Sequence, residues 1–128
     1  MSDQKQPTKS ELAILSVLWE KENATVREIF ESLGSKRRGG YTTVLKLLQI
    51  MYDKGLVGRD ESQRAHIYFP KIRRVEAASG LLGDVVDKVF GGSTSKLVQT
   101  LLDESTTRDE LDEIRRVIDE AEKREGGK

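Results

Sequence analysis

Side chains that can bind phosphates and base edges gather in one stretch near the middle of the sequence. A basic run is followed by two glycines and then by one aromatic, two hydroxyl and one further basic side chain. The residues concerned are Arg37, Arg38, Tyr41, Thr42, Thr43 and Lys46. Arginine and lysine contact phosphates or guanine edges, and threonine contacts phosphates or thymine methyl groups. A DNA-binding helix and the loop that leads into it would carry these residue types.

The same stretch predicts an amphipathic helix over residues 41 to 54. The apolar side chains that would face the protein core are Val44, Leu47, Leu48 and Met51. A helix that enters the major groove must bury one face and present polar side chains on the other. An ordinary amphipathic helix with a solvated polar face is the alternative. The basic run favours DNA, because it lies where the start of the helix would approach phosphates.

A change of hydrophobic period after this helix predicts a β-hairpin. Two β-rich runs, residues 56 to 59 and residues 66 to 69, flank a polar tip. Arg59 and Arg64 lie beside this tip, where the wing of a winged helix crosses the DNA backbone or the minor groove. Arg59 could instead pair with an acidic residue of the tip, so Arg64 is the preferred DNA contact.

Two further helices are expected before residue 41. Thr8 with Glu11 and Thr25 with Glu28 have the Thr-x-x-Glu spacing of a capping box, which satisfies backbone donors at a helix start. Three helices followed by a hairpin is the order of a winged helix-turn-helix. The predicted fold is mainly α with a small β-hairpin, comprising a winged-helix DNA-binding domain over residues 1–71 and a helical dimerisation domain over residues 72–128.

The predicted dimerisation domain consists of helical segments with apolar stripes, interrupted by a glycine pair at residues 91 and 92. Alone, these segments would bury little apolar surface, so each stripe is expected to meet a partner chain. The residues predicted to form the homodimer interface are Val85, Val89, Leu97, Leu101, Leu111, Ile114 and Ile118. Thr107 and Glu110 form a third Thr-x-x-Glu pair, which opens the last helix.

The charge distribution favours a nucleic-acid partner although the net charge is zero. Residues 36 to 74 hold ten basic and three acidic side chains, whereas residues 81 to 128 hold eight basic and twelve acidic ones. The local field of a basic surface attracts nucleic acid whatever the sum over the chain. We therefore expect a basic DNA-binding domain and an acidic dimerisation domain.

Several function classes are disfavoured by what the sequence lacks. Without cysteine there are no disulfides, thiolate metal sites or cysteine nucleophiles. The only histidine, His66, is better explained as a wing or core residue than as a catalytic base, and no phosphate loop or nucleophile elbow is present. We expect no enzyme activity, no cofactor and no metal. Without a signal peptide or an apolar run of about 18 residues, a cytoplasmic protein with no membrane insertion is expected.

Two segments of the sequence resemble the BlaI/MecI/CopY family of bacterial repressors. The first runs from Gly40-Tyr41-Thr42-Thr43-Val44 through Asp53-Lys54-Gly55-Leu56-Val57 to the wing residues Arg64-Ala65-His66-Ile67-Tyr68. The second is Val89-Phe90-Gly91-Gly92-Ser93 followed by Leu97-Val98. The resemblance covers residues 8 to 122. It implies a transcriptional repressor that binds a palindromic double-stranded operator as a homodimer and controls antibiotic-resistance or stress genes.

The resemblance also implies a way in which repression is relieved. In β-lactam-responsive members, a membrane-bound metalloprotease sensor triggers cleavage within the dimerisation arm. The matching stretch in this chain is residues 97 to 102, which places an expected cut near Thr100 and Leu101. Cutting the arm would remove the avidity of two linked DNA-binding domains.

Two departures from the family restrict what the resemblance implies. Copper-responsive members carry a C-terminal cysteine motif, which this chain lacks, so copper sensing is not expected. Staphylococcal repressors tend to have a basic residue where this chain has Ile50, so their operator sequence is not carried over. Two alternatives stay open: a winged-helix protein-protein adaptor, which would lack a basic face, and a ligand-sensing regulator, which would need a pocket beside the arm.

Overall fold

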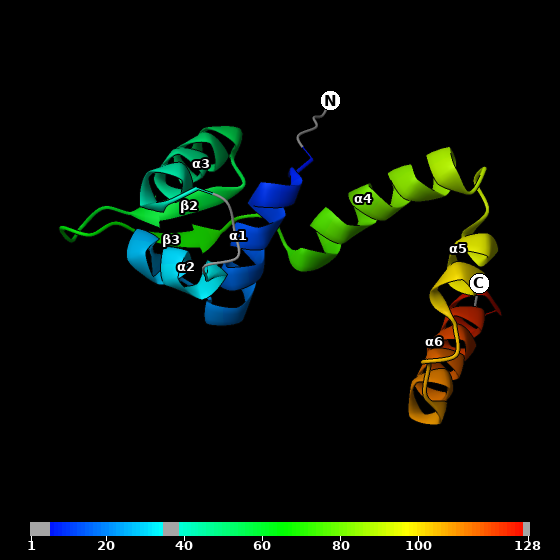
Figure 1. Ribbon diagram of the computed structural model, residues 1–128. Coiled ribbons are helices and arrows are strands. Elements are labelled where there is room, and N and C mark those ends of the chain that lie inside the picture. The colour runs from blue at the N-terminus through cyan, green and yellow to red at the C-terminus, as the bar shows by residue number, and fades with distance from the viewer. Residues whose placement is uncertain (1–5, 35–38, 127–128) are drawn as a thin grey trace. The chain divides into compact units, whose positions relative to one another are not determined.

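The computed structural model describes residues 6–34 and 39–126, and the chain forms two units, residues 1–83 and 84–128. The first unit (Figure 1) contains α1 (Lys9–Lys21), β1 (Ala24–Thr25), α2 (Val26–Leu33), α3 (Tyr41–Lys54), β2 (Val57–Asp60) and β3 (Ile67–Pro70). Helix α4 (Arg74–Val89) begins in the first unit and ends in the second, which continues with α5 (Thr94–Leu101) and α6 (Arg108–Gly126). The predicted fold class, mainly α with a small β-hairpin, is confirmed.

Capping groups fix where the first helices begin. The Thr8 hydroxyl accepts from the Glu11 backbone N–H at 3.2 Å, and the Glu11 carboxylate accepts from the Thr8 N–H at 3.0 Å. Thr25 and Glu28 exchange the same two bonds at 3.2 and 2.9 Å. Both of these predicted capping boxes are confirmed. Helix α3 ends at Gly55, whose φ of 84° lies in the left-handed region that glycine adopts without strain.

The strands form an antiparallel sheet in the order β1-β3-β2. The hairpin of β2 and β3 was predicted, and it pairs Arg59 with Tyr68. Strand β1 was not predicted: Ala24 pairs with Tyr68 on the other edge of β3. A strand of two residues is too short to show a period of two, and only its partner, far along the chain, makes it a strand.

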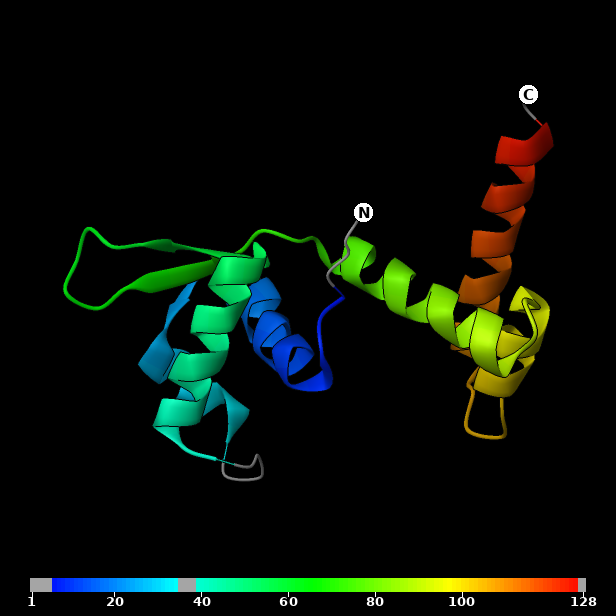
Figure 2. The ribbon, with the colours of Figure 1, turned by 90° about the horizontal axis from the view of Figure 1, so that it is seen from above.

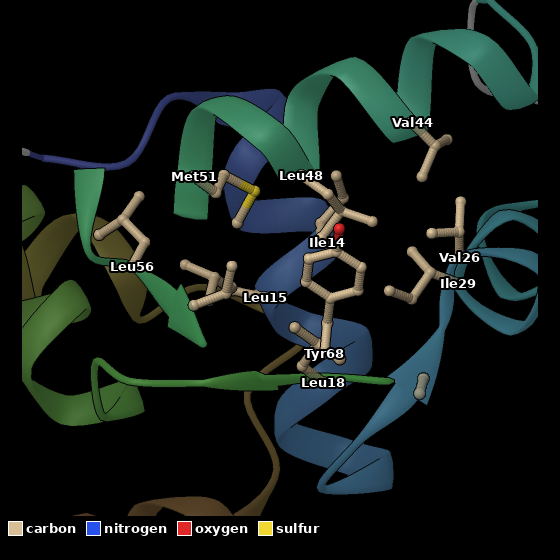
Figure 3. Close-up of a cluster of buried hydrophobic side chains, with 12 residues drawn as sticks. Ile14, Leu15, Leu18, Val26, Ile29, Val44, Leu48, Met51, Leu56 and Tyr68 are labelled. Carbon is tan, nitrogen blue, oxygen red and sulfur yellow. The ribbon is translucent and has the colours of Figure 1, made fainter. Parts of the chain in front are cut away.

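The core of the first unit lies between its helices and one face of the sheet. Its largest fully buried side chains are Ile14, Leu15, Leu18, Ile29, Val44, Leu48, Met51, Val57 and Tyr68. Figure 3 shows Tyr68 pointing from β3 toward Leu48 and Ile14. Helix α1 contributes Ile14, Leu15 and Leu18, all completely buried. The sheet faces the helices through Tyr68, while the neighbouring Phe69 is 39% exposed.

A buried ion pair joins the start of α1 to the end of α3. Glu11 is only 2% exposed, and its two carboxylate oxygens accept from the Lys54 ammonium group at 2.8 and 3.0 Å. A carboxylate inside a protein requires such a partner, because removal from water disfavours its charge. The Thr-x-x-Glu spacing predicted only a capping role for Glu11, and the structure adds this second one.

The start of α4 belongs to the first unit. The Trp19 indole N–H donates to the carbonyl of Ile72 at 3.0 Å, and the Arg74 guanidinium carbon lies 5.5 Å from the centroid of the Trp19 ring. Ala77 is 2% exposed. The structural units therefore divide after residue 83, whereas the division by function between residues 71 and 72 stays a prediction.

The second unit has little core of its own. Gly91 and Gly92 both have positive φ and separate α4 from α5, and the Ser93 hydroxyl caps α5 by accepting from the Lys96 N–H at 3.2 Å. None of the described residues of α5 or α6 is buried. Large apolar side chains are exposed instead, among them Val89 at 68% and Leu101 at 65%.

Replacing Lys54 with methionine tests the buried ion pair. The variant keeps an apolar stem but leaves the Glu11 carboxylate buried without its cation. We expect the free energy of unfolding to fall by about 2–3 kcal/mol, somewhat less than for a fully buried pair, because the Lys54 side chain is 25% exposed. Urea denaturation of the full chain measures this loss. Lys21→Met, at an exposed position of α1, is the control and should cost less than about 0.5 kcal/mol; equal losses for both variants would contradict the assigned role.

Candidate nucleic-acid interface

Helix α3 has two chemically distinct faces. Val44, Leu48 and Met51 are completely buried against the rest of the first unit. The opposite side carries exposed polar side chains, namely Thr42, Thr43, Lys46 and Gln49. A solvent-facing helix surface of short hydroxyl and basic side chains fits the major groove, in which these groups reach base edges and phosphates.

Gly39, just before α3, allows the chain to approach the Thr43 side chain closely. Gly39 has a φ of 81°, and a Cβ atom added there would lie 2.6 Å from the hydroxyl oxygen of Thr43. A larger residue would therefore be strained and would displace the Thr43 side chain. Arg37 and Arg38, the predicted phosphate contacts of this loop, lie outside the described residues.

The hairpin loop extends beyond α3 as a wing, as Figure 2 shows. An open hollow lies between this wing, α3 and the start of α2. Tyr41 and Leu45 line it from α3, and Arg64 and His66 line it from the wing. The structure thus brings together two residues predicted from separate motifs, Tyr41 and Arg64. Among the described residues, no carboxylate pairs with Arg64 or Lys46.

The hollow also includes Arg27, which the sequence analysis missed. Its guanidinium carbon lies 5.0 Å from the centroid of the Tyr41 ring, and that ring meets Phe30 edge to face with centroids 5.9 Å apart. In the sequence, Arg27 is only a basic residue two positions after the Thr25 cap. Such residues are common on solvated helix faces, and the neighbour that distinguishes Arg27 is fourteen positions later in the chain.

Arg59, the other basic residue of the wing, is already paired. Its side chain donates to the Glu61 carboxylate and stacks 4.0 Å from the centroid of the Tyr52 ring. The hydrogen bond to Arg59 holds the pKa of Glu61 below its ordinary value, and the same bond raises the pKa of Arg59. This pairing agrees with the choice of Arg64 over Arg59 as the candidate contact.

Two further features are absent from residues 6–34 and 39–126. No group of three or more histidine, cysteine or acidic side chains that could hold a metal ion occurs there. No helix in that part of the chain is long and apolar enough to cross a membrane. His66, the only histidine, borders the hollow beside Arg64.

A three-helix domain with a two-stranded wing and a polar outer face on its third helix is a winged-helix domain of the DNA-binding type. Residues 7–120 match the family model described as penicillinase repressor. The transcriptional regulator BlaI of Mycobacterium tuberculosis is 33% identical over 119 residues, which cover 92% of this chain and 86% of that protein. The chain therefore belongs to the penicillinase repressor family, as its resemblance to BlaI/MecI/CopY repressors predicted.

Solved structures agree on the fold of the first part of the chain. The solution structure of the DNA-binding domain of the repressor BlaI matches with a TM-score of 0.51 at 21% identity, covering 59% of this chain and 93% of that one. The monomeric form of BlaI from Bacillus licheniformis, in complex with the blaP half-operator, matches with a TM-score of 0.50 at the same identity and coverage. At this level of identity the likeness is one of fold.

Proposed function

We propose that this chain is a transcriptional repressor that binds operator DNA through α3 and the wing. The observation that carries the proposal is the division of α3 into a fully buried face and an exposed face of threonines and Lys46. Membership of the penicillinase repressor family supports it. So does the half-operator bound by a BlaI of the same fold. The proposed location is the cytoplasm, because a bacterial repressor must reach the chromosome there.

The candidate residues divide into two chemical roles. Thr42, Thr43 and Lys46 lie on the outer face of α3 and would contact base edges, which specify the sequence. Tyr41 and Arg64 border the hollow beside that face and would contact the backbone, as would Arg37 and Arg38 of the preceding loop. Backbone contacts supply affinity and register, and base contacts supply discrimination between sequences.

We further propose that the second unit forms the homodimer. Its apolar side chains are half-exposed or exposed in one chain, and α5 and α6 hold no buried residue among those described. The proposed interface residues are Val85, Val89, Leu97, Leu101, Leu111, Ile114 and Ile118. A homodimer implies a palindromic operator, because the two DNA-binding domains are then related by a two-fold axis.

Replacing Thr43 and Lys46 together with alanine tests the proposed base contacts. Both side chains are exposed, so the variant should fold and dimerise as the wild type does. We expect wild-type protein to retard a palindromic fragment of its own upstream region, with half-sites about one helical turn apart, and to do so less as salt rises. The double variant should lose this specific retardation. Wild-type protein that retards no upstream fragment at low salt would contradict the proposed function.

Removing residues 91–128 tests the proposed dimer interface. The first unit keeps its core, so we expect a folded monomer that still binds DNA but more weakly, because the second binding domain is no longer linked to the first. Sedimentation equilibrium measures the oligomeric state of the full and shortened chains, and circular dichroism checks that the shortened chain folds. A shortened chain that stays dimeric would contradict the proposed role of Leu97, Leu101, Leu111, Ile114 and Ile118, because only Val85 and Val89 of the proposed interface remain in it.

Relief of repression by cleavage near Thr100 and Leu101 is a third proposal, drawn from the family resemblance. Leu101 is 65% exposed at the end of α5, and the next residue, Leu102, already has extended backbone angles. The Thr100 hydroxyl donates to the Lys96 carbonyl at 2.9 Å, a bond within one turn of an exposed helix. A protease needs an extended segment, and unwinding this turn would expose no core.

The cleavage proposal predicts a fragment ending at Thr100. Protein recovered from its own cells after β-lactam treatment should contain this fragment by mass spectrometry, and untreated cells should contain the intact chain. Deleting a neighbouring gene for a membrane-bound metalloprotease, where the genome has one, should abolish the fragment. An intact chain in treated cells, or a cut far from residue 100, would contradict the proposal.

A further inference from the structure

One exposed cation of the first unit is held in place by an aromatic ring rather than by a carboxylate. Arg27, the second residue of α2, lies with its guanidinium carbon 5.0 Å from the centroid of the Tyr41 ring. The ring is itself held edge to face by Phe30, at a centroid distance of 5.9 Å and an interplanar angle of 74°. Stacking of this kind restricts the side chain while leaving the edge of the guanidinium available for hydrogen bonds.

The charge of Arg27 is not neutralised within the part of the chain that the structure describes. There, Arg59 pairs with Glu61 and Arg73 pairs with Glu76, but no carboxylate lies within 4.0 Å of the Arg27 guanidinium. The nearest acidic residue in sequence, Glu28, uses its carboxylate to accept from the Thr25 N–H at 2.9 Å. Arg27 is thus an exposed cation without a carboxylate partner among the described residues.

Arg27 also lies at the hollow that the proposed DNA contacts surround. Tyr41 and Leu45 line that hollow from α3, and Arg64 lines it from the wing. Two arginines from different elements thus border one concave surface beside the outer face of α3. A sugar-phosphate backbone that passes α3 and the wing would meet both of them.

We propose that Arg27 binds a backbone phosphate of the DNA that α3 contacts, and that Tyr41 is the residue that positions it. The inference rests on the proposed function and adds a third element, α2, to the interface. The guanidinium group can stack on a ring and bind phosphate through its edge at the same time, which an ammonium group cannot. Because phosphates carry no sequence information, Arg27 contributes affinity and salt dependence but no discrimination between sequences.

Arg27→Ala tests the phosphate contact without knowledge of the operator. The probe is a fluorescent duplex of arbitrary sequence, about three helical turns long, and binding of the full-length protein is followed by anisotropy as a function of KCl concentration. Each lost phosphate contact should reduce the slope of log affinity against log salt by about 0.9 per protomer. At about 0.1 M salt, this corresponds to a loss of roughly tenfold in affinity per protomer.

Lys21→Ala is the charge-matched control. Lys21 is an exposed residue of α1 that borders a different hollow, beside Ser16 and Glu20, so its loss should leave the slope unchanged. Thermal unfolding checks that both variants keep the wild-type melting temperature. If the wild-type protein binds DNA and the Arg27→Ala variant has the same slope of log affinity against log salt, this inference alone is overturned. Wild-type protein that binds no DNA at low salt overturns the proposed function as well.

Combining substitutions tests the role of Tyr41. If the ring positions the guanidinium, Arg27→Ala should weaken binding less in a Tyr41→Ala background than in the wild type, because the arginine is already disordered there. Arg27→Lys should keep most of the salt slope but lose part of the affinity, because an ammonium group retains the charge without the stacked planar fork. Equal effects of Arg27→Ala in both backgrounds overturn the positioning role.

Discussion

Burial of one face of α3 is the constraint on which the rest of the first unit depends. Val44, Leu48 and Met51 are inaccessible to solvent, and they pack beside Ile14 and Tyr68 in the core (Figure 3). The helical period then dictates which residues lie opposite, because side chains advance by a fixed angle from one position to the next. Turning the helix by one residue would bring Thr43 or Gln49 into the core, so the polar face proposed to contact DNA is a consequence of packing.

The two ends of α3 are fixed by different chemistry, which keeps that face in one orientation. At its start, Tyr41 packs against Phe30, and the Arg27 guanidinium lies over the Tyr41 ring. At its end, Lys54 pairs with the buried Glu11. A buried ion pair adds little net stability compared with apolar packing, but it is costly to break, so it disfavours alternative positions of the helix. A helix that reads base edges needs a single, well-defined position, because small displacements of its side chains weaken base contacts.

Local patterns in the sequence predicted the elements well, and long-range pairings account for what was missed. Capping boxes, the Gly55 stop and the hairpin depend on neighbouring residues, so the sequence carries their signal directly. Strand β1 exists only through β3, and the partner of Glu11 is 43 positions away. The outward side chains of α3 followed from its period, whereas the hollow with Arg27 required three elements to be placed together. No local rule links Arg27 to Tyr41.

In the second unit, the helical spacing of apolar residues is clear in the sequence, but the chain on its own buries few of these residues. Short helices in water are marginal unless an apolar face is covered. In α5 and α6 the apolar side chains are covered only in part, and the surface pairs Arg115–Asp112 and Arg116–Glu113 are too exposed to compensate. A second copy offers the same apolar stripes, and the proposed homodimer would supply the missing core. Folding of this unit would then be coupled to dimerisation, and dimerisation to tight DNA binding. A cut in α5 would act on DNA affinity without touching any DNA contact.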